Sequence, residues 1–117
     1  MPKVMLIEDD PTMLVLLRTL LELEGYEVTE MQPQVDVLTS IRSEHPDVVL
    51  MDVHLRGASG LTLLQNIRQD EELLNTRILM SSGADLRYEC QRAGADGFLL
   101  KPFSPDDLIK KLRVAMA

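Results

Sequence analysis

Residues 47–60, DVVLMDVHLRGASG, decide how the rest of the chain is interpreted. The apolar run at residues 48–51 stops abruptly at Asp52. A short apolar run bounded by polar residues and a glycine is typical of a strand buried on both faces. Asp52 then follows the carboxyl end of that strand, where open α/β sheets bind their ligands. An aspartate that merely begins a turn would look the same locally, so the other strand ends must decide.

The composition is that of one ordinary globular domain. The chain has 117 residues, 45% hydrophobic and 26% charged, which is enough for a single core. No apolar run reaches the length of a membrane span, and the N-terminus turns acidic too early for a signal peptide, so we expect a cytoplasmic protein without a membrane partner. The net charge of -7 argues against direct nucleic-acid binding by this domain. The one cysteine, Cys90, is interpreted as a small buried hydrophobic residue.

Strand and helix patterns alternate five times along the chain. The predicted strands are residues 4–7, 26–31, 48–51, 78–80 and 98–100. The predicted helices are residues 11–24 and 35–43, one from 60 to the polar stretch 69–72, then 85–93, and a last one from 105. A turn is predicted at residues 32–34. This alternation favours a parallel sheet with helices on both faces.

Capping residues support the helix boundaries. Asp10 and Pro11 are suited to the start of the first helix, and Gly25 to its end. Ser104 and Asp107 fit a capping box on the last helix. The residues expected to face inward are Leu14, Leu17, Leu21, Val35, Leu38, Ile41, Leu61, Leu64, Ile67, Leu108, Ile109 and Leu112.

Polar side chains follow the predicted strands at the edge where parallel strands end. They are Glu8 and Asp9, Asp52, Ser81 and Lys101. Three neighbouring carboxylates repel one another, and a divalent cation removes that conflict. Oxygen ligands without a His or Cys cluster favour Mg²⁺, Mn²⁺ or Ca²⁺ over zinc. Asp52 is the expected nucleophile for an aspartyl phosphate, with Lys101 and a hydroxyl offsetting the phosphoryl charge.

Over nearly its whole length the chain resembles the receiver domain of the two-component response regulators. The matching segments are LIEDD, DVVLMDVHLRGASG, ILMSSG, AGADGFLLKPF and the capped last helix. The resemblance implies a CheY-like, flavodoxin-like fold, with a doubly wound five-stranded parallel sheet of order 2-1-3-4-5 and five helices. It also implies that residues 1–117 form a single receiver domain.

The resemblance implies the following roles. Asp52 is the phosphoacceptor, served by a sensor histidine kinase or a histidine phosphotransfer protein. Mg²⁺, or alternatively Mn²⁺, is held by Glu8, Asp9, Asp52 and the backbone carbonyl of His54. Ser81 is the switch hydroxyl, Lys101 the phosphoryl contact and Phe98 the aromatic that changes rotamer, and Lys101–Pro102 is a cis peptide.

Phosphorylation is expected to draw Ser81 toward the new oxygens and to let Phe98 turn inward. The surface of the fourth helix, fifth strand and last helix would then control a downstream output protein or a fused output domain. A phosphorylation-dependent homodimer through that surface stays open. The domain is expected to be no enzyme beyond its own phosphorylation and dephosphorylation.

The chain departs from the family pattern in three places. Arg56 replaces the proline usual in the loop after the phosphoacceptor, which predicts a looser loop. Ser82 is larger than the small residue usual after the switch residue, which predicts narrower access to the phosphoryl group. The segment between Ser81 and Lys101 is about two residues short. The side chain of His54 is hypothesised to tune dephosphorylation.

Two alternative functions stay open. A metal-dependent phosphohydrolase would normally need an aspartate where His54 stands. A phosphorylation-independent interaction module would be expected to lack part of the Glu8, Asp9, Asp52, Ser81 and Lys101 set, which is complete here.

Overall fold

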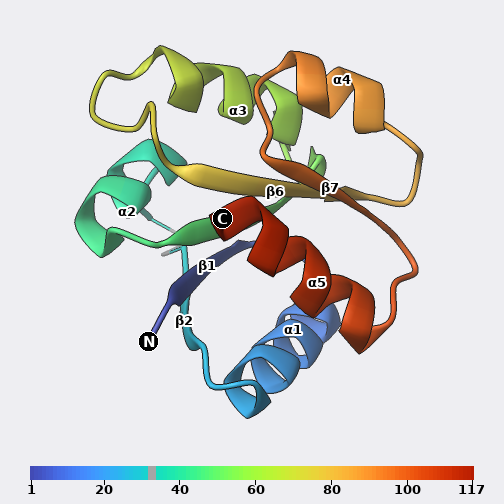
Figure 1. The fold of residues 1–117 in the computed structure, drawn as a ribbon. Coiled ribbons are helices and arrows are strands. Elements are labelled where there is room, and N and C mark those ends of the chain that lie inside the picture. Colours follow the sequence, from blue (N-terminus) through green and yellow to red (C-terminus); the bar gives the residue numbers. More distant parts are fainter. Residues whose placement is uncertain (32–33) are drawn as a thin grey trace.

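A computed structural model gives the structure of the protein and describes residues 1–31 and 34–117. Its centre is a parallel five-stranded sheet in the order β2-β1-β3-β6-β7 (Figure 1). The strands are β1 (Lys3–Ile7), β2 (Glu27–Glu30), β3 (Val48–Asp52), β6 (Arg77–Ser82) and β7 (Gly97–Leu100). Among these five strands the order is 2-1-3-4-5, so the predicted doubly wound fold class is confirmed.

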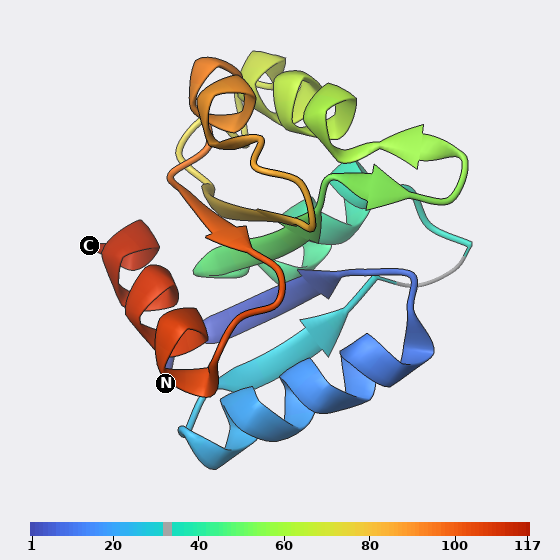
Figure 2. The same cartoon turned by 90° about the vertical axis from the view of Figure 1, so that its right-hand side faces the viewer.

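Five helices in the described part of the chain cover the sheet on both sides. They are α1 (Pro11–Leu23), α2 (Val37–Glu44), α3 (Gly60–Gln69), α4 (Arg87–Arg92) and α5 (Pro105–Met116). Helices α1 and α5 lie on one face, and α2, α3 and α4 lie on the other (Figures 1 and 2). Both faces of the sheet are therefore buried, which explains why the sequences of its strands are continuous apolar runs.

The alternation of side chains along a strand divides the core in two. In β1, Val4 and Leu6 belong to the cluster beneath α1 and α5, while Met5 and Ile7 belong to the cluster beneath α2, α3 and α4. The central strand β3 divides its side chains in the same way. Cys90 lies fully buried in the second cluster, as predicted, and burial raises the pKa of its thiol to about 11.

The predicted helix caps are confirmed. The Asp10 carboxylate accepts the backbone N–H groups of Thr12 and Met13 at the start of α1. Gly25 follows α1 with a φ of 90°, a conformation that favours glycine. Ser104 and Asp107 form the capping box of α5. These local interactions fix the residues at which α1 and α5 begin. They therefore also set the length of the segments that connect β1 to α1 and β7 to α5.

Several predictions differ from the structure. Val35 was expected to face inward, but it precedes α2 and is 36% exposed, and Val37 is buried instead. Helix α4 has six residues, shorter than the predicted 85–93. The predicted turn at 32–34 falls on Gln32 and Pro33, which lie outside the described residues. No helix within 1–31 and 34–117 combines the length and apolarity needed to cross a bilayer.

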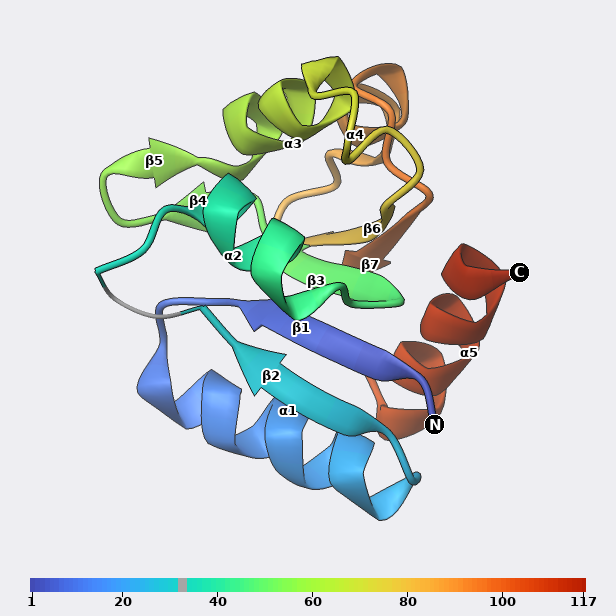
Figure 3. The same cartoon turned by 90° about the vertical axis from the view of Figure 1, so that its left-hand side faces the viewer.

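A small hairpin that the sequence did not predict follows the central strand. Strands β4 (His54–Leu55) and β5 (Ala58–Ser59) pair antiparallel and project beyond the carboxyl edge of the sheet (Figures 2 and 3). Two-residue strands are too short to give a clear period in the sequence. The loop that was expected to be looser is thus closed by strand pairing.

Candidate functional site at the carboxyl edge of the sheet

The carboxyl ends of four strands bring the predicted site residues together. Asp52 ends β3 and is the direct register neighbour of Ser81 on β6. Glu8 follows β1 and Lys101 follows β7. The ammonium Nζ of Lys101 lies 3.0 Å from Glu8 Oε1 and 3.0 Å from Asp52 Oδ2. Four segments far apart in sequence therefore meet at one point, as parallel strands require.

Lys101 is held as a cation between two carboxylates. Burial alone would lower the pKa of its ammonium group. Hydrogen bonds to Asp52 and Glu8, and the negative charges of both, outweigh burial and raise the pKa of Lys101. The side chains of Glu8 and Asp52 are only 7% and 12% exposed, so little water screens these contacts. Lys101 therefore stays charged at neutral pH.

The three consecutive acids after β1 make three different sets of contacts. Glu8 Oε1 contacts Lys101, and its Oε2 accepts the N–H groups of Asp9 and Asp10 at 2.9 and 3.3 Å. The carboxylate of Asp10 caps α1. Asp9 Oδ2 accepts the backbone N–H of Arg56, which lies 47 residues away in the turn of the hairpin. Asp9 is thus bound to the hairpin, while Glu8 is bound to Lys101.

Backbone contacts hold Asp52 and the hairpin base in place. The N–H of His54 donates to Asp52 Oδ1 at 3.1 Å, so each oxygen of Asp52 accepts one hydrogen bond. The N–H of Gly60 donates to Val53 O at 2.7 Å. A Cβ at Gly60 would lie 2.3 Å from the backbone oxygen of Asp52, closer than atoms approach. Glycine is therefore required where α3 passes the phosphoacceptor candidate.

The donor chemistry of this edge fits a hard divalent cation. The carboxylates of Glu8, Asp9 and Asp52 line one depression of about 580 Å³ together with His54 and Lys101. These carboxylates offer only oxygen atoms as metal ligands, which suits Mg²⁺ or Mn²⁺. Within the described ranges, however, no three acidic, His or Cys side chains stand close enough to form a metal-binding group. The oxygen groups predicted to hold the ion lie at this edge, but Asp9 bonds to the Arg56 N–H.

Ser81 and Ser82 point to opposite faces of the sheet. Along β6, Leu79 belongs to the cluster under α1 and α5, whereas Met80 belongs to the cluster under α2, α3 and α4. Because successive side chains of a strand point to opposite faces, Ser81 lies on the same face of the sheet as Leu79, and Ser82 on the same face as Met80. The buried Oγ of Ser81 has no hydrogen-bond partner among the described residues and lies in a small cavity with Asp52 and Lys101.

Phe98 shares the face of Ser82, not that of Ser81. Phe98 is the register neighbour of Met80 and belongs to the same buried cluster, whereas Leu99 lies beside Ser81. The prediction that Ser81 makes room for Phe98 therefore needs correction, because the sheet separates these two side chains. Phe98 is only 4% exposed, so its ring already points inward, and the Arg87 guanidinium lies 5.9 Å from the ring centroid.

Sequence reasoning missed two groups at this edge. The first is Ser82, whose Oγ accepts the N–H of Ala84 at 3.1 Å and which is completely buried. The sequence analysis named Ser82 only as a large neighbour of Ser81, because no local pattern fixes the end of β6 to one residue. The second is the backbone N–H of Arg56, for which the sequence carries no signal because every residue except proline has one.

Comparison with known proteins places this chain in a family. Residues 4–113 match the family model of the response regulator receiver domain. The chain is 31% identical over 119 residues to the phosphate regulon transcriptional regulatory protein PhoB of Rhizobium meliloti, covering 99% of this chain and 52% of PhoB. It therefore spans about half the length of that relative and of the PhoB of Pseudomonas aeruginosa.

Shorter relatives match over most of their length. The chain is 29% identical over 113 residues to the polar-differentiation response regulator DivK of Brucella ovis, covering 94% of this chain and 92% of DivK. The structure of the chemotaxis response regulator CheY4 of Vibrio cholerae superposes with a TM-score of 0.87 at 27% identity, covering 98% of each chain. The sequence and the fold thus point to the same group of proteins.

Proposed function

Since the chain belongs to the family of response regulator receiver domains, we propose that Asp52 accepts a phosphoryl group from a phosphohistidine of a sensor kinase or phosphotransfer protein. The observation that carries this proposal is the contact of Lys101 with Asp52 and Glu8 at 3.0 Å each. A cation fixed beside a nearly buried carboxylate at the carboxyl edge of the sheet is suited to phosphoryl transfer.

The transfer exchanges one phosphorus bond for another. One carboxylate oxygen of Asp52 attacks the phosphorus atom, and the bond from phosphorus to the partner's imidazole nitrogen breaks. The electron pair of that bond leaves with the imidazole nitrogen, and an acyl phosphate remains on Asp52. Lys101 is close enough to Asp52 to stabilise the negative charge on the transferred oxygens.

Glu8, Asp9, Asp52 and the backbone carbonyl of His54 would hold a Mg²⁺ or Mn²⁺ ion at this site. When bound, the ion supplies positive charge to the phosphoryl oxygens and relieves the repulsion between carboxylates. Both oxygens of Glu8 and both oxygens of Asp52 already accept hydrogen bonds, so an ion would share them with their present donors. The hairpin holds Asp9 through the hydrogen bond from the Arg56 N–H to Oδ2.

We propose that Ser82 couples the phosphoryl group to Phe98. The two residues lie on the same face of the sheet, and Phe98 lies beneath α4 with Arg87 above its ring. Movement of the Ser82 hydroxyl toward a phosphoryl oxygen would break its bond to the Ala84 N–H and change the packing around Phe98. Ser81 keeps a different role, since its unpaired hydroxyl lies beneath Asp52 and Lys101.

The surface that would report this change lies between α4 and α5. A cavity of about 310 Å³ there is lined by Arg87, Gln91, Phe98, Lys111 and Val114, among others. An output protein, a fused output domain or a second copy of the chain would bind at this surface and respond to Phe98. Because the chain spans half of its PhoB relatives, a fused output domain is one of the arrangements that this proposal includes.

Intact-mass measurement after incubation with acetyl phosphate and Mg²⁺ tests the proposal. The wild type should gain one phosphoryl group, and Asp52→Asn or added EDTA should prevent the gain. If no adduct forms, titration with beryllofluoride distinguishes rapid hydrolysis from an inactive site. Absence of beryllofluoride binding would contradict the proposal and favour a phosphorylation-independent interaction module.

Two variants test the finer assignments. Ser82→Ala should leave phosphoryl uptake measurable but abolish the change in the Phe98 ring resonances on phosphorylation, whereas Ser81→Ala should retain it. The His54 side chain is exposed at the rim of the depression, and we propose that it tunes hydrolysis of the acyl phosphate. An unchanged acyl-phosphate lifetime in His54→Ala would contradict that role.

A further inference from the structure

The hydrogen bond between Asp9 and the turn of the hairpin separates one acidic residue from the others. Asp9 Oδ2 accepts the backbone N–H of Arg56, whereas Glu8 and Asp52 both contact Lys101. In the described residues no group of three such side chains has assembled. The hairpin therefore orients Asp9 through its Oδ2, whereas Lys101 orients Glu8 and Asp52.

The hairpin holds its N–H donor firmly in place. Strands β4 and β5 are paired through His54 with Ser59 and Leu55 with Ala58, which leaves Arg56 and Gly57 at the turn. The base of the hairpin is fixed because Val53 is buried and its N–H donates to Ser81 O at 2.9 Å. A donor on such a short, anchored loop is preorganised for the carboxylate that it faces.

We propose that the backbone N–H of Arg56 competes with the divalent cation for the carboxylate of Asp9 and so weakens cation binding at this site. This inference rests on the proposed phosphoacceptor function. A hydrogen bond to a charged group is stronger than one between neutral groups, so breaking it lowers the net gain from cation binding. Arg56 is a positioning residue: its backbone N–H makes the contact that carries the inference, while its side chain lines the same depression.

Proline at position 56 would remove the donor and keep the shape of the turn. Gly57 has a φ of 71°, and His45 is the only non-glycine residue with positive φ in the part of the chain that the structure describes. Arg56 therefore has negative φ and precedes a glycine of positive φ, the pattern of a type II turn, in which proline is favoured at the first central position. Leu55 is in β4, and extended backbone is the conformation that a residue before proline adopts.

The experiment compares Mg²⁺ affinity in the wild type, Arg56→Pro and Arg56→Ala by isothermal titration calorimetry. Arg56→Ala is the matched control, because it removes the side chain and keeps the N–H. We expect Arg56→Pro to bind Mg²⁺ about tenfold more tightly than Arg56→Ala, since both variants lose the Arg56 charge and only Arg56→Pro also loses the N–H. Equal affinity in the two variants, or weaker binding by Arg56→Pro, would overturn the inference.

Amide hydrogen exchange in the wild type gives a second readout that does not depend on a folded variant. Saturating Mg²⁺ should speed exchange at the Arg56 amide several-fold and leave the Val53 amide unchanged, since Val53 donates to Ser81 and not to the site. If the Arg56 amide exchanges at the same rate or more slowly with Mg²⁺ than without it, the proposed competition is wrong. The proposed phosphoacceptor function would be unaffected by that result. Failure of all three proteins to bind Mg²⁺ would overturn both the inference and the metal site.

Discussion

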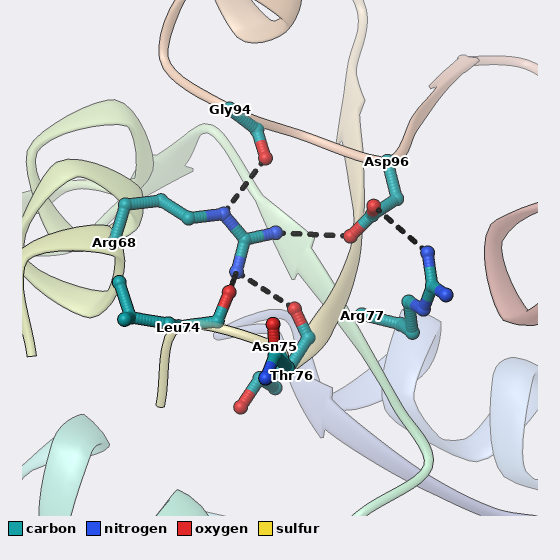
Figure 4. A pocket seen from close by; sticks show the side chains of 7 residues that line it. All are labelled: Arg68, Leu74, Asn75, Thr76, Arg77, Gly94 and Asp96. Atoms are coloured by element: carbon teal, nitrogen blue, oxygen red, sulfur yellow. Dashed lines mark hydrogen bonds and ion pairs between the residues drawn. The ribbon is translucent and has the colours of Figure 1, made fainter. Parts of the chain in front are cut away.

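Two ionic clusters lie at opposite ends of the same sheet and are built in opposite ways. At the amino ends of β6 and β7, the Arg68 guanidinium donates to the carbonyls of Gly94, Leu74 and Thr76 and to the carboxylate of Asp96, at 2.7 to 3.3 Å (Figure 4). At the carboxyl ends, Lys101 is shared by Glu8 and Asp52. The first cluster is the arginine cluster below, and the second is the lysine cluster.

The two clusters differ in whether their polar groups are satisfied. In the arginine cluster, Asp96 also accepts the N–H of Ile78 at 2.8 Å and lies 3.5 Å from Arg77. In the lysine cluster, one ammonium group contacts two carboxylates, and within residues 1–31 and 34–117 the buried hydroxyl of Ser81 has no hydrogen-bond partner. A saturated cluster stabilises a fold, while unused hydrogen-bonding capacity is typical of a site that binds something else.

The largest expected effect breaks the arginine cluster. Arg68→Met removes the hydrogen bonds of Arg68 to three carbonyls and to Asp96, which keeps the Ile78 N–H, and should lower the free energy of unfolding by about 3 kcal/mol in urea denaturation. Arg77→Met is the control. Loss of the partly exposed ion pair between Arg77 and Asp96 should change the free energy of unfolding by less than about 1 kcal/mol. In the folded Arg68→Met variant, Asp52 should accept the phosphoryl group at the wild-type rate. A loss of phosphoryl uptake in the folded variant would show that the two clusters are not independent.

The next effect concerns the lysine cluster alone. Mg²⁺ at ten times its dissociation constant should raise the free energy of unfolding of the wild type by about 1.4 kcal/mol, since the ion binds only the folded carboxylates. Arg68→Met should show the same increment, and Asp9→Asn a smaller one. Thermal denaturation with and without EDTA measures this difference. An equal increment in Asp9→Asn would exclude Asp9 as a ligand.

The unpaired hydroxyl of Ser81 gives a smaller effect of opposite sign. Ser81→Ala removes a buried polar atom without a partner and should raise the free energy of unfolding by about 1 kcal/mol. Ser82→Ala should lower it instead, because the Ala84 N–H then loses its acceptor. Chemical denaturation of both variants without added metal tests the pair. Destabilisation by Ser81→Ala would mean that this hydroxyl is satisfied in solution.

The smallest effect uses pH to separate the two clusters. The pKa of Lys101 is raised above its ordinary value of 10.5, so its contribution to stability is complete below pH 10.5 and is lost as the pH rises through the folded-state pKa. The stability difference between the wild type and Lys101→Met should therefore shrink above pH 10.5. The corresponding difference for Arg68→Met should stay constant, since arginine does not lose its proton there. Urea denaturation at pH 9 and pH 11 measures both differences.

Much of the carboxyl edge could be predicted from the sequence because each strand ends in a polar residue. The apolar runs before Glu8, Asp52 and Lys101 predict parallel strands, and parallel strands deliver their ends to one edge. The same reasoning could not choose between Ser81 and Ser82. A one-residue change of register moves a side chain to the other face, and no local pattern fixes the end of β6 to that accuracy.

The arginine cluster shows a different limit. Its members at positions 68, 77 and 96 belong to three separate segments, and no strand-end pattern connects them in the sequence. Arg68 is found there because α3 ends over the amino ends of β6 and β7, a consequence of how the helices cover the sheet (Figure 4). Its ion pairs could be recognised only once these elements were placed.

By itself, the sequence determined the order of the elements, the caps of α1 and α5, and the chemistry of the acidic edge. These features depend on interactions within a few residues, or on apolar periodicity, which a single chain displays directly. Only the tertiary structure decided that Ser82 and not Ser81 faces Phe98, and that Asp9 bonds to the Arg56 N–H across 47 residues. Such contacts depend on strand register and on a backbone donor that nearly every residue has, so the identity of the amino acid carries no information about them.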